Sequence, residues 1–162
     1  MRDALAQPAE ILRTDATTLI DETTRRTLSV HIPAASQQPI RDIFDNLLPE
    51  LSAHFGVPLT AYEEPQFLRY GPGSFFTAHR DRPRSGHLDT SDRKASFVIF
   101  LNNDFEGGEL TFYELLDDPG FAGAGFPCDA IPGLAIAFRS EIIHEVTPVT
   151  RGERFTIVTW FS

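Results

Sequence analysis

The chain has 162 residues, of which 41% are hydrophobic, and a formal net charge of −9. This length suits one compact domain and is sufficient to bury a core without disulfides, which the single cysteine, Cys128, cannot form within the chain. The negative charge argues against a general binder of nucleic acid or of membrane surfaces, because little positive charge is available to neutralise phosphates.

The beginning of the chain gives no sign of a targeting or membrane segment. Residues 1 to about 24 are polar, lack the apolar core of a signal peptide, and predict a short helix followed by irregular chain. No apolar run approaches the roughly 20 residues that a membrane span needs. We therefore expect a cytoplasmic protein.

A strand and a helix are predicted next. Residues 27–32 alternate polar and apolar side chains, which is typical of a half-buried strand. Over residues 40–55, apolar side chains recur at spacings of three and four, which predicts an amphipathic helix. Pro39 can open this helix, Pro49 is expected to kink it or split it in two, and Gly56 is a good stop.

From Pro65 onward the pattern changes to β-structure. Segment 95–101 is nearly all apolar, as expected for a strand buried on both faces, whereas 115–130 is rich in glycine and proline and predicts a loop. Short extended segments are predicted at 66–70, 74–79, 95–101, 109–113, 134–138, 146–149 and 155–161. Seven to nine such strands behind one or two N-terminal helices indicate a mainly β fold, a β-sandwich or jelly roll.

The polar segment 82–94 separates two of these strands and predicts a loop that covers a site. Basic residues in and beside it predict a clamp for an acidic or carboxylate-bearing substrate. They are Arg80, Arg82, Arg84, Arg93 and Lys94.

The most informative pattern is His79-Arg80-Asp81, followed far downstream by His144 and Arg154. A histidine and an aspartate two residues apart on an extended segment point to the same side, so both can bind one metal ion. His144 can supply a third ligand if the fold brings its strand alongside. Two histidines and one carboxylate leave the opposite face of the metal open, as in non-haem Fe(II) oxygenases. Arg154 then offers a cationic fork for a carboxylate-bearing co-substrate.

From about Phe67 to its C-terminus, the chain resembles the prolyl 4-hydroxylase-like branch of the Fe(II)- and 2-oxoglutarate-dependent dioxygenases. The matching elements stand in the family's order. They are Tyr70, His79-Arg80-Asp81, Leu101-Asn102, the segments 105–112 and 132–138, His144-Glu145-Val146-Thr147-Pro148-Val149 and Gly152-Glu153-Arg154.

The resemblance implies a double-stranded β-helix, or jelly roll, with iron in its mouth. It implies that His79, Asp81 and His144 are the iron ligands. Related halogenases replace the carboxylate with a small residue, so the presence of Asp81 favours hydroxylation.

The resemblance also implies residues for the co-substrate. Arg154 matches the residue that pairs with the distal carboxylate of 2-oxoglutarate, and Tyr70 matches a tyrosine that hydrogen-bonds it. Trp160 occupies a position that can line the pocket, although both aromatic residues could instead serve only as core. The cofactors expected from the family are Fe(II), 2-oxoglutarate and dioxygen, with ascorbate as a further candidate.

The leading hypothesis is a hydroxylase of a prolyl residue or of a small amino-acid-like substrate, with release of succinate and CO2. Desaturation or cyclisation by the same iron chemistry is one alternative, and a non-catalytic jelly roll that binds metal and ligand is another. We treat residues 1–162 as one domain, in which 1–62 cover a jelly-roll core formed by 63–162. The expected partner is a small-molecule or peptidyl substrate, with no nucleic acid and no membrane, and the sequence gives no view of the oligomeric state.

Overall fold

The computed structural model describes residues 10–11, 23–82 and 92–162 of the chain. These residues form one α-helix, α2 (Ala34–Phe55), one 3-10 helix, η2 (Pro119–Phe121), and short antiparallel strands. The strands are β1 (Glu10–Ile11), β2 (Arg25–Arg26), β3 (Leu28–Ser29), β4 (Gln66–Tyr70), β5 (Phe75–His79), β6 (Ala95–Phe100), β7 (Phe105–Gly107), β8 (Leu110–Tyr113), β9 (Gly125–Cys128), β10 (Ala135–Arg139), β11 (Ile143–Val146), β12 (Val149–Gly152) and β13 (Arg154–Phe161).

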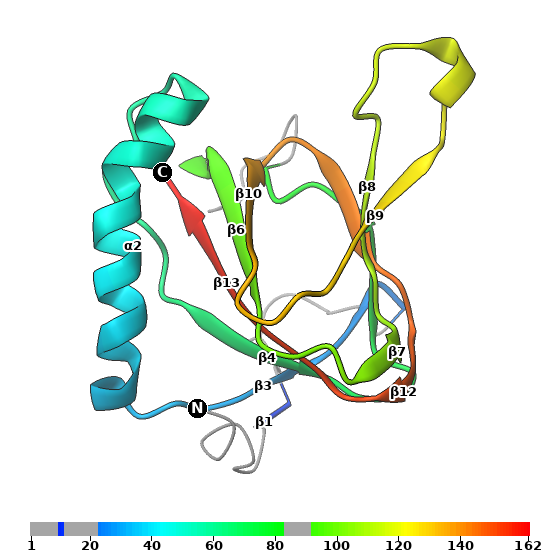
Figure 1. Cartoon of the computed structure of the whole chain (residues 1–162), viewed down its shortest axis with the longest axis horizontal. Helices are drawn as coiled ribbons and strands as arrows, with labels where there is room; N and C mark the ends of the chain where they lie inside the picture. Colours follow the sequence, from blue (N-terminus) through cyan, green and yellow to red (C-terminus); the bar gives the residue numbers. More distant parts are fainter. Residues whose placement is uncertain (1–9, 12–22, 83–91) are drawn as a thin grey trace.

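The strands form two main sheets that face each other (Figure 1), and the predicted jelly roll is confirmed. One sheet has six strands in the order β1-β3-β4-β13-β6-β10, and the other has five in the order β2-β5-β11-β8-β9. A small pair, β12-β7, closes one end. Strands distant in the sequence are therefore neighbours, which is the arrangement that a site built from residues 79–81 and 144 requires.

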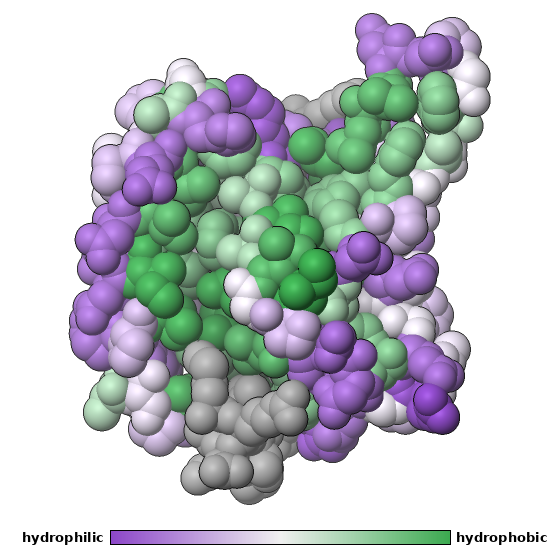
Figure 2. Space-filling view, in the orientation of Figure 1, coloured by the Kyte–Doolittle hydropathy of each residue, from purple (hydrophilic) through white to green (hydrophobic). Residues whose placement is uncertain are grey.

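Helix α2 covers the outer face of the six-stranded sheet (Figure 1). Phe44 is fully buried there, and its ring meets those of Tyr62, Phe97 and Phe161 edge-on at centroid distances of 5.4–6.0 Å. The opposite side of the helix is hydrophilic (Figure 2). The predicted amphipathic helix and its end at Gly56, which adopts a left-handed φ of 67°, are confirmed.

The prediction was wrong about where α2 begins, and the helix is not split at Pro49. The helix begins at Ala34, directly after Pro33, and runs without a break through Pro39 and Pro49. Each proline removes one helical hydrogen bond. Both are exposed, so the carbonyl groups left unpaired can bind water, while the buried face holds the helix on the sheet.

Two strand predictions also need correction. The segment 115–130, predicted as loop, contains β9, which pairs with β8. Because β9 lies at the sheet edge, it tolerates Pro127, which has no N–H to donate. Its hairpin with β8 projects from the body (Figures 1 and 2) and exposes Leu115, Leu116 and Phe121. The single strand predicted at 146–149 is instead a junction, because β11 ends at Val146 and β12 begins at Val149.

Some predictions fall on residues whose structure is not described. The short helix expected near the N-terminus lies largely in this part of the chain. So does most of the expected loop 82–94, including Arg84. Within the described residues, no helix is long and apolar enough to cross a membrane.

We predict that Phe44→Ala lowers the free energy of unfolding by about 3–5 kcal/mol, because it leaves a cavity between α2 and the sheet. Urea unfolding followed by circular dichroism measures the change. The neighbouring Ile43, which is 45% exposed, provides a matched control, and Ile43→Ala should cost less than about 1 kcal/mol. Equal effects of the two changes would contradict the proposed packing.

Candidate metal centre

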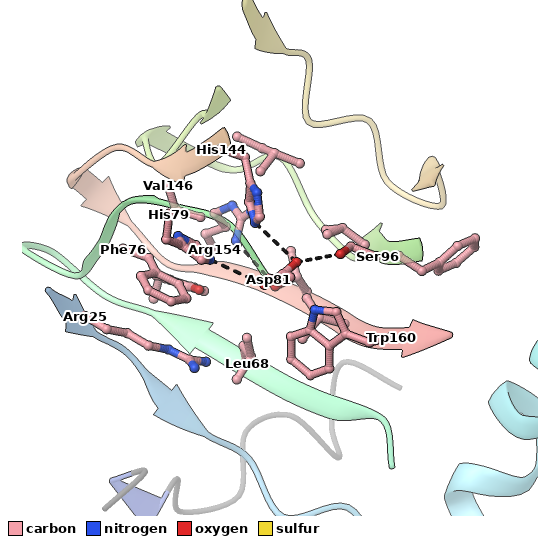
Figure 3. Close-up of a pocket in the computed structure, with 16 residues that line it drawn as sticks. Arg25, Leu68, Phe76, His79, Asp81, Ser96, His144, Val146, Arg154 and Trp160 are labelled. Carbon is pink, nitrogen blue, oxygen red and sulfur yellow. Dashed lines mark hydrogen bonds and ion pairs between the residues drawn. The ribbon is translucent and has the colours of Figure 1, made fainter. Parts of the chain in front are cut away.

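Strands β5 and β11 bring the two predicted histidines together. His79 and His144 are direct partners in the antiparallel pairing, and their ring centroids lie 4.3 Å apart. Asp81 follows His79 by two residues, as the sequence pattern required. One ligand atom from each of the three side chains lies within 4.8 Å of the other two (Figure 3).

Backbone carbonyls select the tautomer of both histidines. Nδ1 of His79 lies 2.8 Å from the carbonyl oxygen of Thr77, and Nδ1 of His144 lies 3.0 Å from that of Ile142. Because a carbonyl oxygen only accepts, Nδ1 carries the proton in each ring and Nε2 keeps its lone pair for a metal. Each Nε2 lies 3.5 Å from a carboxylate oxygen of Asp81. The donor set therefore fits a divalent metal held by two imidazoles and one carboxylate.

The protonation states also favour metal binding. Burial alone would raise the pKa of Asp81. The contact with His79, the positive charge that His144 and His79 can carry, and the Ser96 hydroxyl outweigh burial and hold this pKa well below its usual range. Burial is the main cause that lowers the pKa of His144. The site thus contains a carboxylate and a neutral imidazole near pH 7, which are the forms that bind metal.

A buried hydrogen-bond chain fixes the carboxylate of Asp81. The Ser96 hydroxyl donates to Oδ2 of Asp81 at 2.6 Å, and its oxygen lies 2.9 Å from the hydroxyl oxygen of Ser140. Both serines are at most 1% exposed. Sequence reasoning missed them, although a serine within the otherwise apolar segment 95–101 was a usable signal.

Arg154 is a buried cation without a carboxylate partner among the described residues. It is 1% exposed, lies 5.0 Å from the ring centre of Tyr70 and 5.2 Å from that of Phe100, and donates one long hydrogen bond to Thr156 at 3.3 Å. Its Nε has no hydrogen-bond partner in the part of the chain that the structure describes. Burial lowers the pKa of Arg154 to about 10, so the group remains charged at neutral pH. Burying such a charge costs free energy, and an anion that pairs with it offsets this cost.

The metal cluster and Arg154 line one cavity, whose empty space of about 470 Å³ includes open solvent at its mouth (Figure 3). Alternation along β13 turns Arg154, Thr156, Val158 and Trp160 toward this cavity. Tyr70 also lines it, so all six residues singled out from the sequence meet at one place. The ring of Trp160 is covered on its other side by Arg93, whose guanidinium carbon lies 3.7 Å from the ring centre.

A family model described as the 2OG-Fe(II) oxygenase superfamily matches residues 65–162. The chain belongs to this superfamily. The matched region contains every residue of the cluster and Arg154, and the family implies iron and 2-oxoglutarate for this oxygenase.

The relatives of this oxygenase include PKHD-type hydroxylases. The one from Alteromonas mediterranea is 35% identical over 103 residues, which are 60% of this chain and 42% of that protein. The one from Sphingopyxis alaskensis is 31% identical over 145 residues, or 85% of this chain and 62% of that protein. The matches thus cover 42–62% of the length of these curated relatives.

The fold of the oxygenase is shared with prolyl hydroxylases of known structure. A Pseudomonas putida prolyl-4-hydroxylase has a TM-score of 0.68 and 28% identity, and the match covers 87% of this chain and 74% of that one. A Trichoplax adhaerens prolyl hydroxylase, solved in complex with a peptide fragment of the hypoxia inducible factor oxygen degradation domain, has a TM-score of 0.69. Its identity is 18%, with coverage of 99% of this chain and 71% of that one, so it supports the fold alone.

The basic residues near the oxygenase site are largely neutralised. Arg80 pairs with Glu114, Arg82 with Glu141 and Arg93 with Glu63. The side chain of Lys94 donates to the carbonyl oxygen of Pro58. The described part of the expected clamp therefore has little free charge for a substrate. Two glutamates lie close to His144 in the sequence. Glu145 accepts a hydrogen bond from Tyr113, and Glu141 accepts one from Arg82.

We predict that Ser96→Ala weakens metal binding to the oxygenase about 10- to 100-fold, because Asp81 loses the donor that orients it. Anaerobic competition for Fe(II) with a coloured chelator measures the affinity directly. Ser140→Ala is the matched control, since Ser140 contacts Ser96 but donates nothing to Asp81. An unchanged affinity in Ser96→Ala would show that Asp81 is oriented by other means.

Proposed function

We propose that this chain is an Fe(II)- and 2-oxoglutarate-dependent oxygenase that hydroxylates a prolyl residue or a small amino-acid-like substrate. One observation carries the proposal. Three metal-binding side chains and an unpaired, buried arginine line a single cavity. The first set suits iron, and the second suits the distal carboxylate of a 2-oxo acid.

Each side chain has a separate task in this proposal. His79, Asp81 and His144 hold the metal through one face and leave the other face for ligands. Arg154 binds and orients 2-oxoglutarate by charge-assisted hydrogen bonds, and the Tyr70 hydroxyl adds a further contact. When bound, iron and 2-oxoglutarate supply the oxidation, in which dioxygen is consumed, succinate and CO2 are released, and one oxygen atom enters a C–H bond of the substrate.

The walls of the cavity exclude water from this chemistry. Leu68, Val146, Val158 and Trp160 present apolar surface around the metal cluster. A dry site strengthens the electrostatic contacts of Arg154 and limits side reactions of the oxidant. In this proposal Trp160 forms part of the pocket wall.

The remaining features of the proposal concern the whole chain. We treat residues 1–62 and 63–162 as parts of one domain, in which the described helix α2 covers the six-stranded sheet. The names of the relatives favour a hydroxylase, and those of the structural neighbours favour a prolyl or peptidyl substrate. Dioxygen is the co-substrate, ascorbate maintains the iron in its reduced form, and the protein acts in the cytoplasm.

Two alternatives remain open. Desaturation or cyclisation would use the same ligands, and the mass of the product separates it from hydroxylation, because the substrate would lose two hydrogen atoms instead of gaining one oxygen atom. A non-catalytic binding module would bind metal and 2-oxoglutarate without turnover for any substrate tested. The complete set of three ligands together with Arg154 favours catalysis over this second alternative.

We predict that anaerobic addition of Fe(II) and then 2-oxoglutarate produces a weak visible absorption band that requires both. The band arises when the 2-oxo acid chelates the protein-bound iron, so His79→Ala should abolish it. His54 lies on α2, away from the cluster, and His54→Ala is the control that should retain it. A folded protein that gives no band would refute the proposed function.

We predict that Arg154→Gln weakens binding of 2-oxoglutarate by about 2–5 kcal/mol, because a buried carboxylate loses its cation. The same absorption band, titrated with 2-oxoglutarate, measures this affinity, and Fe(II) binding should remain. Arg151→Gln removes an exposed arginine from the neighbouring strand and should leave the affinity unchanged. An Arg154→Gln protein with wild-type affinity would remove Arg154 from its proposed role.

A further inference from the structure

A second arginine, Arg25, lines the cavity that contains the metal cluster. It comes from β2, which pairs with β5 so that Arg25 lies opposite Phe76. Its guanidinium carbon lies 4.8 Å from the centre of the Phe76 ring, and its side chain extends past that ring toward Leu68 (Figure 3). The Nε of Arg25 is buried and has no hydrogen-bond partner in the described structure.

Arg25 is connected to the predicted metal ligand His79 through the ring of Phe76. The Phe76 ring stacks on the imidazole of His79, with centroids 3.6 Å apart and planes inclined by 16°. The guanidinium of Arg25, the Phe76 ring and the His79 imidazole therefore form a continuous column that ends at a metal ligand. A group bound by Arg25 would lie beside the reaction centre, where the substrate has to be held.

The charge of Arg25 has no balancing carboxylate among the described residues, in contrast to three other arginines near the metal ligands or the cavity wall. Arg80, Arg82 and Arg93 each pair with a glutamate. Among the residues that the structure describes, Arg25 and Arg154 are the arginines of the cavity wall. In the proposed function, 2-oxoglutarate uses Arg154 for one carboxylate and the metal for the other, so it leaves Arg25 free. An unpaired cation beside an apolar wall favours an anionic ligand.

We propose that Arg25 determines substrate specificity by binding a carboxylate of the substrate, and that the substrate of this oxygenase is therefore one that carries a carboxylate. The inference rests on the proposed function, which supplies the iron and 2-oxoglutarate, and it names the chemical class on which they act. The carboxylate is that of a free amino acid or that of an acidic side chain next to the target residue in a peptide.

Binding of matched acid and amide probes to the anaerobic complex with Fe(II) and 2-oxoglutarate tests the inference. L-proline is compared with L-prolinamide, and a blocked prolyl-aspartyl dipeptide with its prolyl-asparaginyl counterpart, so the two pairs separate the two sources of the carboxylate. Trp160 is the only tryptophan of the chain and lines the cavity, so its fluorescence reports binding without turnover.

At least one acid should bind the wild-type complex about 10- to 100-fold more tightly than its amide, as expected for a charge-assisted hydrogen bond. Arg25→Gln should abolish this preference, and Arg25→Lys should retain part of it because the charge remains while the planar fork is lost. Arg26 is the next residue of β2 and is exposed, so Arg26→Gln is the matched control and should keep the full preference.

The outcomes separate this inference from the proposed function. If the absorption band forms but no acid binds, or acids and amides bind equally, Arg25 does not select a substrate that carries a carboxylate and the oxygenase assignment stands. Retention of the preference in Arg25→Gln has the same meaning. If Arg25→Gln instead weakens 2-oxoglutarate itself, Arg25 belongs to the co-substrate site and the inference is wrong. Absence of the band in the wild-type protein overturns both proposals.

Discussion

The antiparallel pairing of β5 with β11 is the constraint on which the candidate metal centre depends. It places His79 directly opposite His144, and it also fixes the face of the sheet on which both imidazoles lie. A slip of one residue in this register would turn one imidazole to the opposite face and separate the ligands. Asp81 lies two residues beyond the last residue of β5, so the same register brings its carboxylate to the two imidazoles, and the Ser96 hydroxyl then holds it in place.

The two faces of the six-stranded sheet have different roles: the outer face packs against α2, and the inner face lines the cavity. Along β13, Ile157 and Phe161 point outward into the apolar cluster under α2, where they are fully buried. Arg154, Thr156 and Trp160 alternate with them and point into the cavity. The inner face therefore carries buried polar groups that cost free energy in the absence of ligands, while the packing of α2 on the outer face stabilises the fold that holds them.

Close packing around Arg154 explains Gly108, the second of the two glycines that precede β8. A Cβ atom on Gly108 would lie 2.8 Å from Cγ2 of Val149 and 3.2 Å from Cδ of Arg154, and the residue has a φ of 63°. Only glycine provides both the conformation and the space. The matching segment 105–112 therefore helps to place the arginine side chain as well as to form a turn, which links a loop motif to the co-substrate site.

Local sequence information was sufficient to predict the mainly β class, the covering helix and the six candidate residues. These follow from local information: the two-residue spacing of His79 and Asp81, the apolar period of α2, and an ordered set of motifs over the matched region. It misjudged the beginning of α2 and missed β9, because proline and glycine lower local propensity whereas burial and edge position, which are tertiary properties, override it.

Which arginines form ion pairs is visible in the tertiary structure and not in the sequence. The sequence grouped Arg80, Arg82 and Arg93 as a basic cluster, yet each lies against a glutamate from a distant segment. Arg25 had no distinguishing local pattern, and β2 brings it beside Phe76 at the cavity. Ion pairing and burial depend on distances between residues far apart along the chain, and such distances are set by strand pairing and not by spacing in the sequence.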